Sequence, residues 1–208
     1  MSKSVVIVGK GPSVMRSSKE FVESFDEVAF CNFPPVDGYE KCIGTHCDWM
    51  FANMWDLNLY EDKIVENLGL KHIFNTHIKP CPDGNAFANK FSVGYSHDYG
   101  TVVVNEIKTN YNFDPSTGIQ AFYFFVKNPE YTTIGLVGFD NFKTGEKGYY
   151  YSVSEVQSSL KYLYSGGDTP YTNDGIRRKP TLHGSTEMME KFIKETSEKY
   201  GVTLRKPE

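Results

Sequence analysis

Short apolar runs alternate along the amino-terminal half of the chain with polar segments that have helical spacing. Four of these runs predict strands, at residues 5–8, 26–33, 47–53 and 70–76. Runs of this length, bounded by turn residues and rich in Val, Ile and Phe, are typical of strands that are buried on both faces. Helices are predicted between them over 17–24, where Phe21 and Phe25 are four residues apart, and over 56–69.

The carboxyl-terminal half continues this alternation after a long irregular stretch. Residues 79–100 are rich in Gly, Pro and Asn and predict a loop. A helix is predicted over 116–128, a strand over 131–140, a capped amphipathic helix over 185–201 and a short edge strand over 202–205. The stretch 143–180 predicts an irregular, lid-like segment over the acceptor, with one helical piece at 154–164.

Strands that alternate with helices predict an α/β fold, with a mostly parallel sheet flanked by helices. A chain of 208 residues with 39% hydrophobic content suits a single domain, which we expect to span residues 1–208. The formal charge of −4 disfavours nonspecific nucleic-acid binding. No apolar run approaches the ~20 residues of a membrane span, and the apolar run near the start is too short for a signal peptide, so we expect a cytoplasmic protein.

The four cysteines do not indicate a metal site or a reactive thiol. Cys31, Cys42, Cys47 and Cys81 show no paired spacing of a zinc site, and none has a neighbouring base in the sequence. We therefore expect reduced cysteines that pack in the core.

Candidate binding residues follow four of the expected strands. Gly9–Ser13, Asn32, Asn53 and Gly138–Asp140 each lie at the carboxyl end of a strand. In open parallel sheets, ligands bind beyond the carboxyl ends of the strands. Asn32 and Asn53 each offer a donor and an acceptor, as recognition of a ribose or a base edge requires, although either could be an ordinary turn residue.

Two segments have the character of anion sites. The turn Gly-Lys-Gly-Pro-Ser at 9–13 matches neither the GxGxxG motif nor the P-loop motif. Its exposed amides and Lys10 are nevertheless suited to binding a phosphate. The alternative is an ordinary turn between a strand and a helix. At 114–122, Ser116 and Thr117 can cap a helix while Gly118 lets a ligand approach its first turn; the alternative is a plain N-cap.

One residue is a candidate general base. His183 precedes the last helix, and a histidine titrates near neutrality, so it could accept a proton from an attacking hydroxyl. The chain has no HExxH, no D-x-D and no G-x-S-x-G motif. We therefore expect no metal and no cofactor, and no hydrolase-type nucleophile.

Taken in order, these segments resemble the sialyltransferases, both the animal-type family and the bacterial CMP-sialic acid transferases. The quoted segments are VVIVGKG, FCNFPPVDGYEKCIGTHCD, PSTGIQAFYFF with IGLVGFD, GYYY and HGSTEMME, over residues 4–54 and 114–190. The resemblance implies a Rossmann-like, GT-A-like domain and a metal-independent, inverting transfer of sialic acid or another CMP-activated sugar. The implied partners are a CMP-sugar donor and a hydroxyl acceptor on a glycan, a lipid-linked sugar or, less favoured, a modified nucleobase.

The resemblance also implies roles for individual residues. Tyr150, or a tyrosine beside it within 149–151, would donate to the departing phosphate, His183 would be the general base, and Tyr149 would contact the substrate or nucleotide. The donor nucleotide would be held by the following residues: Gly9, Lys10, Gly11, Ser13, Asn32, Asn53, Ser116, Thr117, Gly118 and Asp140.

Three departures from the family pattern bear on these expectations. Lys10 stands where the family has asparagine, which leaves the donor sugar open. Glu187 and Glu190 follow His183 by four and seven residues instead of five. The small motif lacks a cysteine found in secreted relatives, which favours a bacterial or viral enzyme. The competing hypotheses are a nucleotide-binding or sensing protein that keeps the CMP pocket without transfer, and a different α/β enzyme such as a nucleotide-sugar hydrolase.

Overall fold

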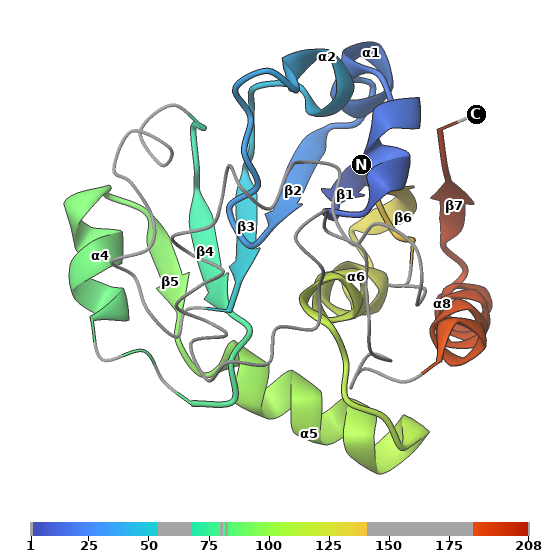
Figure 1. Ribbon diagram of the computed structural model, residues 1–208. Helices are drawn as coiled ribbons and strands as arrows, with labels where there is room; N and C mark the ends of the chain where they lie inside the picture. Colours follow the sequence, from blue (N-terminus) through green and yellow to red (C-terminus); the bar gives the residue numbers. More distant parts are fainter. Residues whose placement is uncertain (1, 54–67, 80, 82, 141–184, 208) are drawn as a thin grey trace, which may run out of the picture.

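The computed structural model describes residues 2–53, 68–79, 81, 83–140 and 185–207 (Figure 1). Its centre is a seven-stranded sheet in the order β5-β4-β3-β2-β1-β6-β7. The strands are β1 (Lys3–Val8), β2 (Glu27–Cys31), β3 (Trp49–Ala52), β4 (His72–Asn75), β5 (Gly94–Ser96), β6 (Tyr131–Val137) and β7 (Thr203–Arg205). Every pairing in the sheet is parallel. The expected α/β fold is confirmed.

Helices cover both faces of this sheet. They are η1 (Pro12–Arg16), α1 (Lys19–Glu23), α2 (Glu40–Ile43), α4 (Gly84–Lys90), α5 (Tyr99–Tyr111), α6 (Thr117–Lys127) and α8 (Thr186–Tyr200). Figure 1 shows α5, α6 and α8 gathered on one side of the sheet, with α1 and α2 on the other. The architecture is therefore a three-layer α/β fold.

The alternation of side chains along β1 produces the two cores. Val5 and Ile7 pack with buried residues of α5, α6 and α8, whereas Val6 and Val8 pack with those of η1, α1 and α2, against which the partly buried Phe87 of α4 also packs. All four side chains are fully buried. A strand that is covered on both faces needs apolar residues at consecutive positions, which explains the unbroken run at 5–8.

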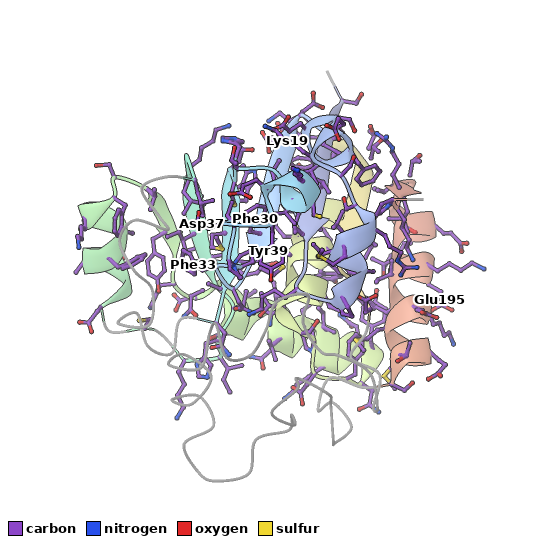
Figure 2. All side chains as sticks on the ribbon, turned by 45° about the horizontal axis from the view of Figure 1, so that its top comes forward. Lys19, Phe30, Phe33, Asp37, Tyr39 and Glu195 are labelled. Carbon is purple, nitrogen blue, oxygen red and sulfur yellow. The ribbon has the colours of Figure 1, made fainter. Side chains whose placement is uncertain are left out.

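The outer sides of the helices carry charged pairs. Figure 2 labels Lys19 on α1 and Glu195 on α8; Lys19 pairs with Glu23 at 3.5 Å and Lys191 with Glu195 at 3.7 Å. Figure 2 also labels Phe30 on β2 and, in the segment after it, Phe33 and Tyr39. Phe30 and Phe33 are buried in the core that β1 shares with α1 and α2, and Tyr39 packs against it.

The sequence predicted most of these elements but was wrong at 79–100. Expected strands at 5–8, 26–33, 47–53, 70–76, 131–140 and 202–205 are confirmed, as are helices at 116–128 and 185–201. The segment expected to be a loop contains α4, β5 and the start of α5. Helix 17–24 is shorter, Lys19–Glu23, with η1 before it. The helices expected at 56–69 and 154–164 and the lid at 143–180 lie outside the described residues, apart from the two turn residues 68–69.

Two carboxylates stabilise the amino ends of the central strands. Glu27 accepts hydrogen bonds from Trp49 Nε1 at 2.6 Å and Tyr131 Oη at 2.5 Å. Asp48 accepts from the Val28 amide at 2.9 Å and pairs with Lys71 at 2.6 Å. Buried carboxylates need such donors to offset the cost of losing water. Glu27 and Asp48 thus use their carboxylates to hold the fold at this edge of the sheet.

The four cysteines are all free, and three of them are buried. Cys31 packs in one core, and Cys42, Cys47 and Cys81 pack in or against the other. The expectation of packing cysteines is confirmed. Among the described residues, no helix is both long enough and apolar enough to cross a membrane.

Candidate nucleotide site

The carboxyl ends of β1 and β6 meet at the point where the strand order reverses. From β1 the chain proceeds outward through β2 and β3 to β5, then returns by α5 and α6 to β6 on the other side of β1. In doubly wound sheets, this reversal opens a crevice in which ligands bind. The turn 9–13 follows β1 there, and Gly138 follows β6.

The two turns are packed backbone against backbone. Gly9 N–H donates to the Val137 carbonyl at 2.8 Å, and Gly11 N–H donates to the Gly138 carbonyl at 3.0 Å. A Cβ on Gly11 would lie 2.0 Å from Asp140 Oδ2 and 2.7 Å from the Gly138 oxygen. Gly11 was expected to bind the nucleotide phosphate. The close packing against Asp140 and Gly138 by itself requires a residue without a side chain at this position.

Asp140 fixes the start of η1. Its Oδ2 accepts from the Ser13 amide at 2.9 Å and from the Ser13 hydroxyl at 2.8 Å, and Arg16 lies 4.0 Å from its Oδ1. The structure thus brings together Gly9, Gly11, Ser13 and Asp140. One oxygen of the Asp140 carboxylate is used to shape the turn.

Asn32 joins β2, β3 and α6. Its backbone is in the left-handed region, with φ 57°. Its side-chain Oδ1 accepts from the Asn53 amide at 2.7 Å, and its Nδ2 donates to Thr117 Oγ1 at 3.3 Å. The expected residues Asn32, Asn53 and Thr117 are thereby placed in one hydrogen-bonded group.

Helix α6 begins at this same edge. Ser116 is its N-cap, and the Ser116 hydroxyl accepts from the Ile119 amide at 3.4 Å. A Cβ on Gly118 would lie 3.1 Å from the Phe139 ring, so the first turn of α6 touches the segment after β6. The amino end of a helix presents unpaired N–H groups and a partial positive charge, which favours an anion.

Lys10 adds a cation near the end of β2. Burial raises the pKa of the Cys31 thiol to about 12, and the Lys10 ammonium opposes that rise. Cys31 is the last residue of β2 and directly precedes Asn32. The Lys10 charge therefore acts at the carboxyl end of β2.

Sequence reasoning missed three residues of this edge. Thr76 directly follows β4, and its hydroxyl lies 3.2 Å from that of Thr117. Gln120 donates from Nε2 to the Thr76 carbonyl at 3.2 Å. Asn75 is fully buried, and its Nδ2 donates to the carbonyls of Lys79 and His97. The rule that pointed to Asn32 and Asn53, a polar residue closing a strand, also applied to Asn75 and Thr76.

The expected catalytic residues lie outside the described part of the chain. These residues are Tyr149, Tyr150 and His183. Glu187 and Glu190, the two glutamates that follow His183 at spacings different from the family's, lie on the described helix α8. In the described residues, no group of three or more His, Cys, Asp or Glu side chains is placed to hold a metal ion.

Comparisons with solved structures address the fold. No protein-family model matches the chain, and no curated protein sequence matches it. The sialyltransferase CstII from Campylobacter jejuni, in complex with the substrate analogue CMP-3FNeuAc, aligns with a TM-score of 0.66 at 16% identity, over 99% of this chain and 81% of that one. A structure of CST-II with a trisaccharide acceptor and CMP gives a TM-score of 0.63 at 14% identity, over 99% and 81%. A mammalian sialyltransferase gives 0.60 at 12% identity, over 100% and 70%. The chain has the fold of these sialyltransferases.

Proposed function

We propose that this protein is a glycosyltransferase that moves a sugar from a CMP-sugar to an acceptor hydroxyl. The observation that carries the proposal is the group at the strand-order reversal: the turn 9–13, Asn32, Asn53 and the start of α6. These groups converge from separate strands in a fold shared with a sialyltransferase that has been solved with a CMP-sugar analogue. Donor sugars in this proposal are sialic acid or another CMP-activated sugar.

The described residues offer what binding of cytidylate requires. The amino end of α6 and the Lys10 ammonium are suited to the phosphate, whereas the amides of Gly9, Gly11 and Ser13 already donate within the protein and shape the turn. Asn32 and Asn53 are suited to the ribose or the base edge, because an amide side chain both donates and accepts. In this proposal, Ser116, Thr117 and Gly118 hold the ribose and the phosphate of the nucleotide, and their position at the start of α6 supports that role.

Transfer in this proposal is a single displacement with inversion. The acceptor oxygen forms a bond to the anomeric carbon as the bond to the phosphate oxygen breaks, and that electron pair leaves with CMP. His183 takes the acceptor proton. Tyr150, or a tyrosine beside it within 149–151, donates to the departing phosphate, whose developing charge the chain's own donors then stabilise without a metal ion.

A ligand panel tests the nucleotide part of the proposal. Thermal unfolding is measured with CMP, CDP, UDP, GDP and NAD, each in the presence of EDTA. We expect a concentration-dependent rise in Tm for CMP above that for the other ligands, because a ligand that binds only the folded state stabilises it. Selective stabilisation by UDP or NAD would contradict the proposal.

Transfer is tested separately from binding. With a CMP-sugar and a glycan acceptor, the wild type should release CMP, and His183→Ala should lose transfer by 100-fold or more, as for loss of a general base (about 10²–10⁴). CMP affinity should stay within about twofold. A wild type that binds CMP but transfers nothing across a donor and acceptor panel would instead support the nucleotide-sensing hypothesis.

A further inference from the structure

The side chain of Asn32 has a defined orientation. The Asn53 backbone N–H can only donate, so the Asn32 atom 2.7 Å from it must be the oxygen. The Asn32 amide nitrogen therefore faces Thr117 Oγ1, at 3.3 Å, and donates to it. One of the two lone pairs of the Thr117 hydroxyl is filled in this way.

The hydroxyl of Thr76 is placed to fill the other lone pair. Thr76 is 4% exposed, and within the described residues Thr117 Oγ1, at 3.2 Å, is its hydroxyl's partner. If Thr117 donated to Thr76, the Thr76 hydrogen would be buried with no acceptor, which is costly. Donation from Thr76 to Thr117 avoids that cost.

A hydroxyl whose two lone pairs are both filled can act only as a donor. Thr117 is half-buried, whereas Thr76 is buried behind it. Thr117 is also the first residue of α6, where the first amides have no acceptor within the helix and Ser116 takes up the amide of Ile119. A Thr117 hydroxyl that can only donate therefore adds a donor at the helix start, where an anion or another acceptor would bind.

Other contacts hold Thr76 in this position. Its amide donates to the Ala52 carbonyl at 2.8 Å, and its carbonyl accepts from Gln120 Nε2 at 3.2 Å. Gln120 Nε2 also lies 3.4 Å from the Pro115 carbonyl, so one buried side chain ties the end of β4 to the loop before α6. A Cβ on Gly100 would lie 2.5 Å from the Thr76 carbonyl carbon, so α5 packs directly against the same residue.

We infer that Thr76 is a positioning residue for nucleotide binding: it donates to Thr117 and thereby makes the Thr117 hydroxyl a donor to the ligand. This inference rests on the proposed function, since the ligand is taken to be a cytidine nucleotide. Gln120 acts one step further away by holding the Thr76 backbone.

Substitutions at both threonines test this role by CMP titration calorimetry. Thr76→Val keeps the shape and removes the donor, and we expect CMP affinity to fall about 5- to 10-fold, the loss of one hydrogen bond. Thr76→Ser should restore it to within about twofold. In a Thr117→Val background, Thr76→Val should have no further effect, because it acts through Thr117. Unchanged affinity in Thr76→Val, or additive losses, would overturn the inference.

Stability effects are separated by a matched control. Ile134→Val removes one buried methylene from β6 without touching this group, so it should lower Tm and leave CMP affinity unchanged. If Ile134→Val reduced CMP affinity as much as Thr76→Val, the loss would be one of stability and the inference would fail.

A measurement without ligand distinguishes this inference from the proposed function. In the NMR spectrum of the free protein, we expect a slowly exchanging Thr76 hydroxyl proton with a cross-peak to the Thr117 side chain, absent in Thr76→Val. A slowly exchanging Thr117 hydroxyl proton pointing to Thr76 would overturn the inference even if CMP binds. Failure of CMP to bind, with the Thr76 proton present, would instead contradict the proposed function.

Discussion

At the scale of single residues, many of the hydrogen-bond donors and acceptors of the site are used in contacts within the protein, and a ligand can bind only to those that remain. Asp140 uses Oδ2 for both donors of Ser13, and Asn32 uses Oδ1 for Asn53 and Nδ2 for Thr117. The sequence identified these residues by type and by their place after a strand. It could not show their partners, because those contacts join residues 127, 21 and 85 positions apart.

Gly11→Ala tests how tightly the turn must pack. The added Cβ would meet Asp140 Oδ2 at 2.0 Å and the Gly138 backbone oxygen at 2.7 Å, so the turn must open. We expect lower stability, by about 1–3 kcal/mol as for overpacking, and at least a tenfold loss of CMP affinity by calorimetry.

The matched control for this change is Gly201→Ala. Gly201 has φ 67° and nothing within 4 Å of an added Cβ, so alanine there costs conformational strain alone, about 1 kcal/mol. Stability should fall and CMP affinity should not. Equal CMP affinity in Gly11→Ala and wild type would show that the turn is not part of the site.

At the scale of elements, helix starts that look equivalent in sequence differ in what they face. Ser116 caps α6 and Ser185 caps α8 in the same way: the serine hydroxyl accepts a hydrogen bond from a backbone amide, that of Ile119 in α6 and that of Met188 in α8. Only the α6 cap lies beside Thr117 and Asn32. The pattern predicted both helices but could not say which one begins at the strand-order reversal.

Ser116→Ala and Ser185→Ala separate capping from binding. Each should lower the free energy of unfolding by about 1 kcal/mol, the usual cost of losing an N-cap. Only Ser116→Ala should also weaken CMP binding, by several-fold, because its helix start faces the proposed phosphate. A several-fold loss of CMP affinity in Ser185→Ala as well would argue against a specific role of α6.

The missed elements α4 and β5 have a physical explanation at the same scale. The α4 sequence Gly84–Lys90 contains two Asn and a Gly, and β5 has three residues, so local propensity and periodicity are both weak. Tertiary contacts stabilise them instead. Phe87 of α4 packs edge-on against Phe33 at 6.3 Å, and β5 pairs with β4 along its length.

At the scale of the whole molecule, the amino ends of the strands carry groups that stabilise the fold, and the carboxyl ends carry the candidate site. The amino edge holds buried Glu27 and Asp48, whose donors come from neighbouring strands and loops, whereas the carboxyl edge holds the turn, Asn32 and Thr117. The chain order of strands and helices was enough to predict a parallel sheet and to select its carboxyl edge. The position of the strand-order reversal required the spatial order, which periodicity does not contain.

Acid stability reports on the amino edge. Burial raises the pKa of Asp48, but bonds from Lys71, Val28 and His46 outweigh it, and the net pKa is lowered. A carboxyl whose pKa is lower in the folded state stabilises the fold above its unfolded pKa, and this contribution is lost as pH falls below about 4. The free energy of unfolding, from urea titrations at pH 7 to 3, should fall more steeply for wild type than for Asp48→Asn. Parallel curves would contradict this.

The central claim is that a cytidine nucleotide binds at the strand-order reversal between β1 and β6. A crystal structure of the protein with CMP tests it most directly. We expect the phosphate beside the turn 9–13, within hydrogen-bond distance of the Lys10 side chain or of amides at the start of α6, and the ribose or base beside Asn32 and Thr117. CMP bound at the amino edge, or on a helix surface away from β1 and β6, would contradict the claim.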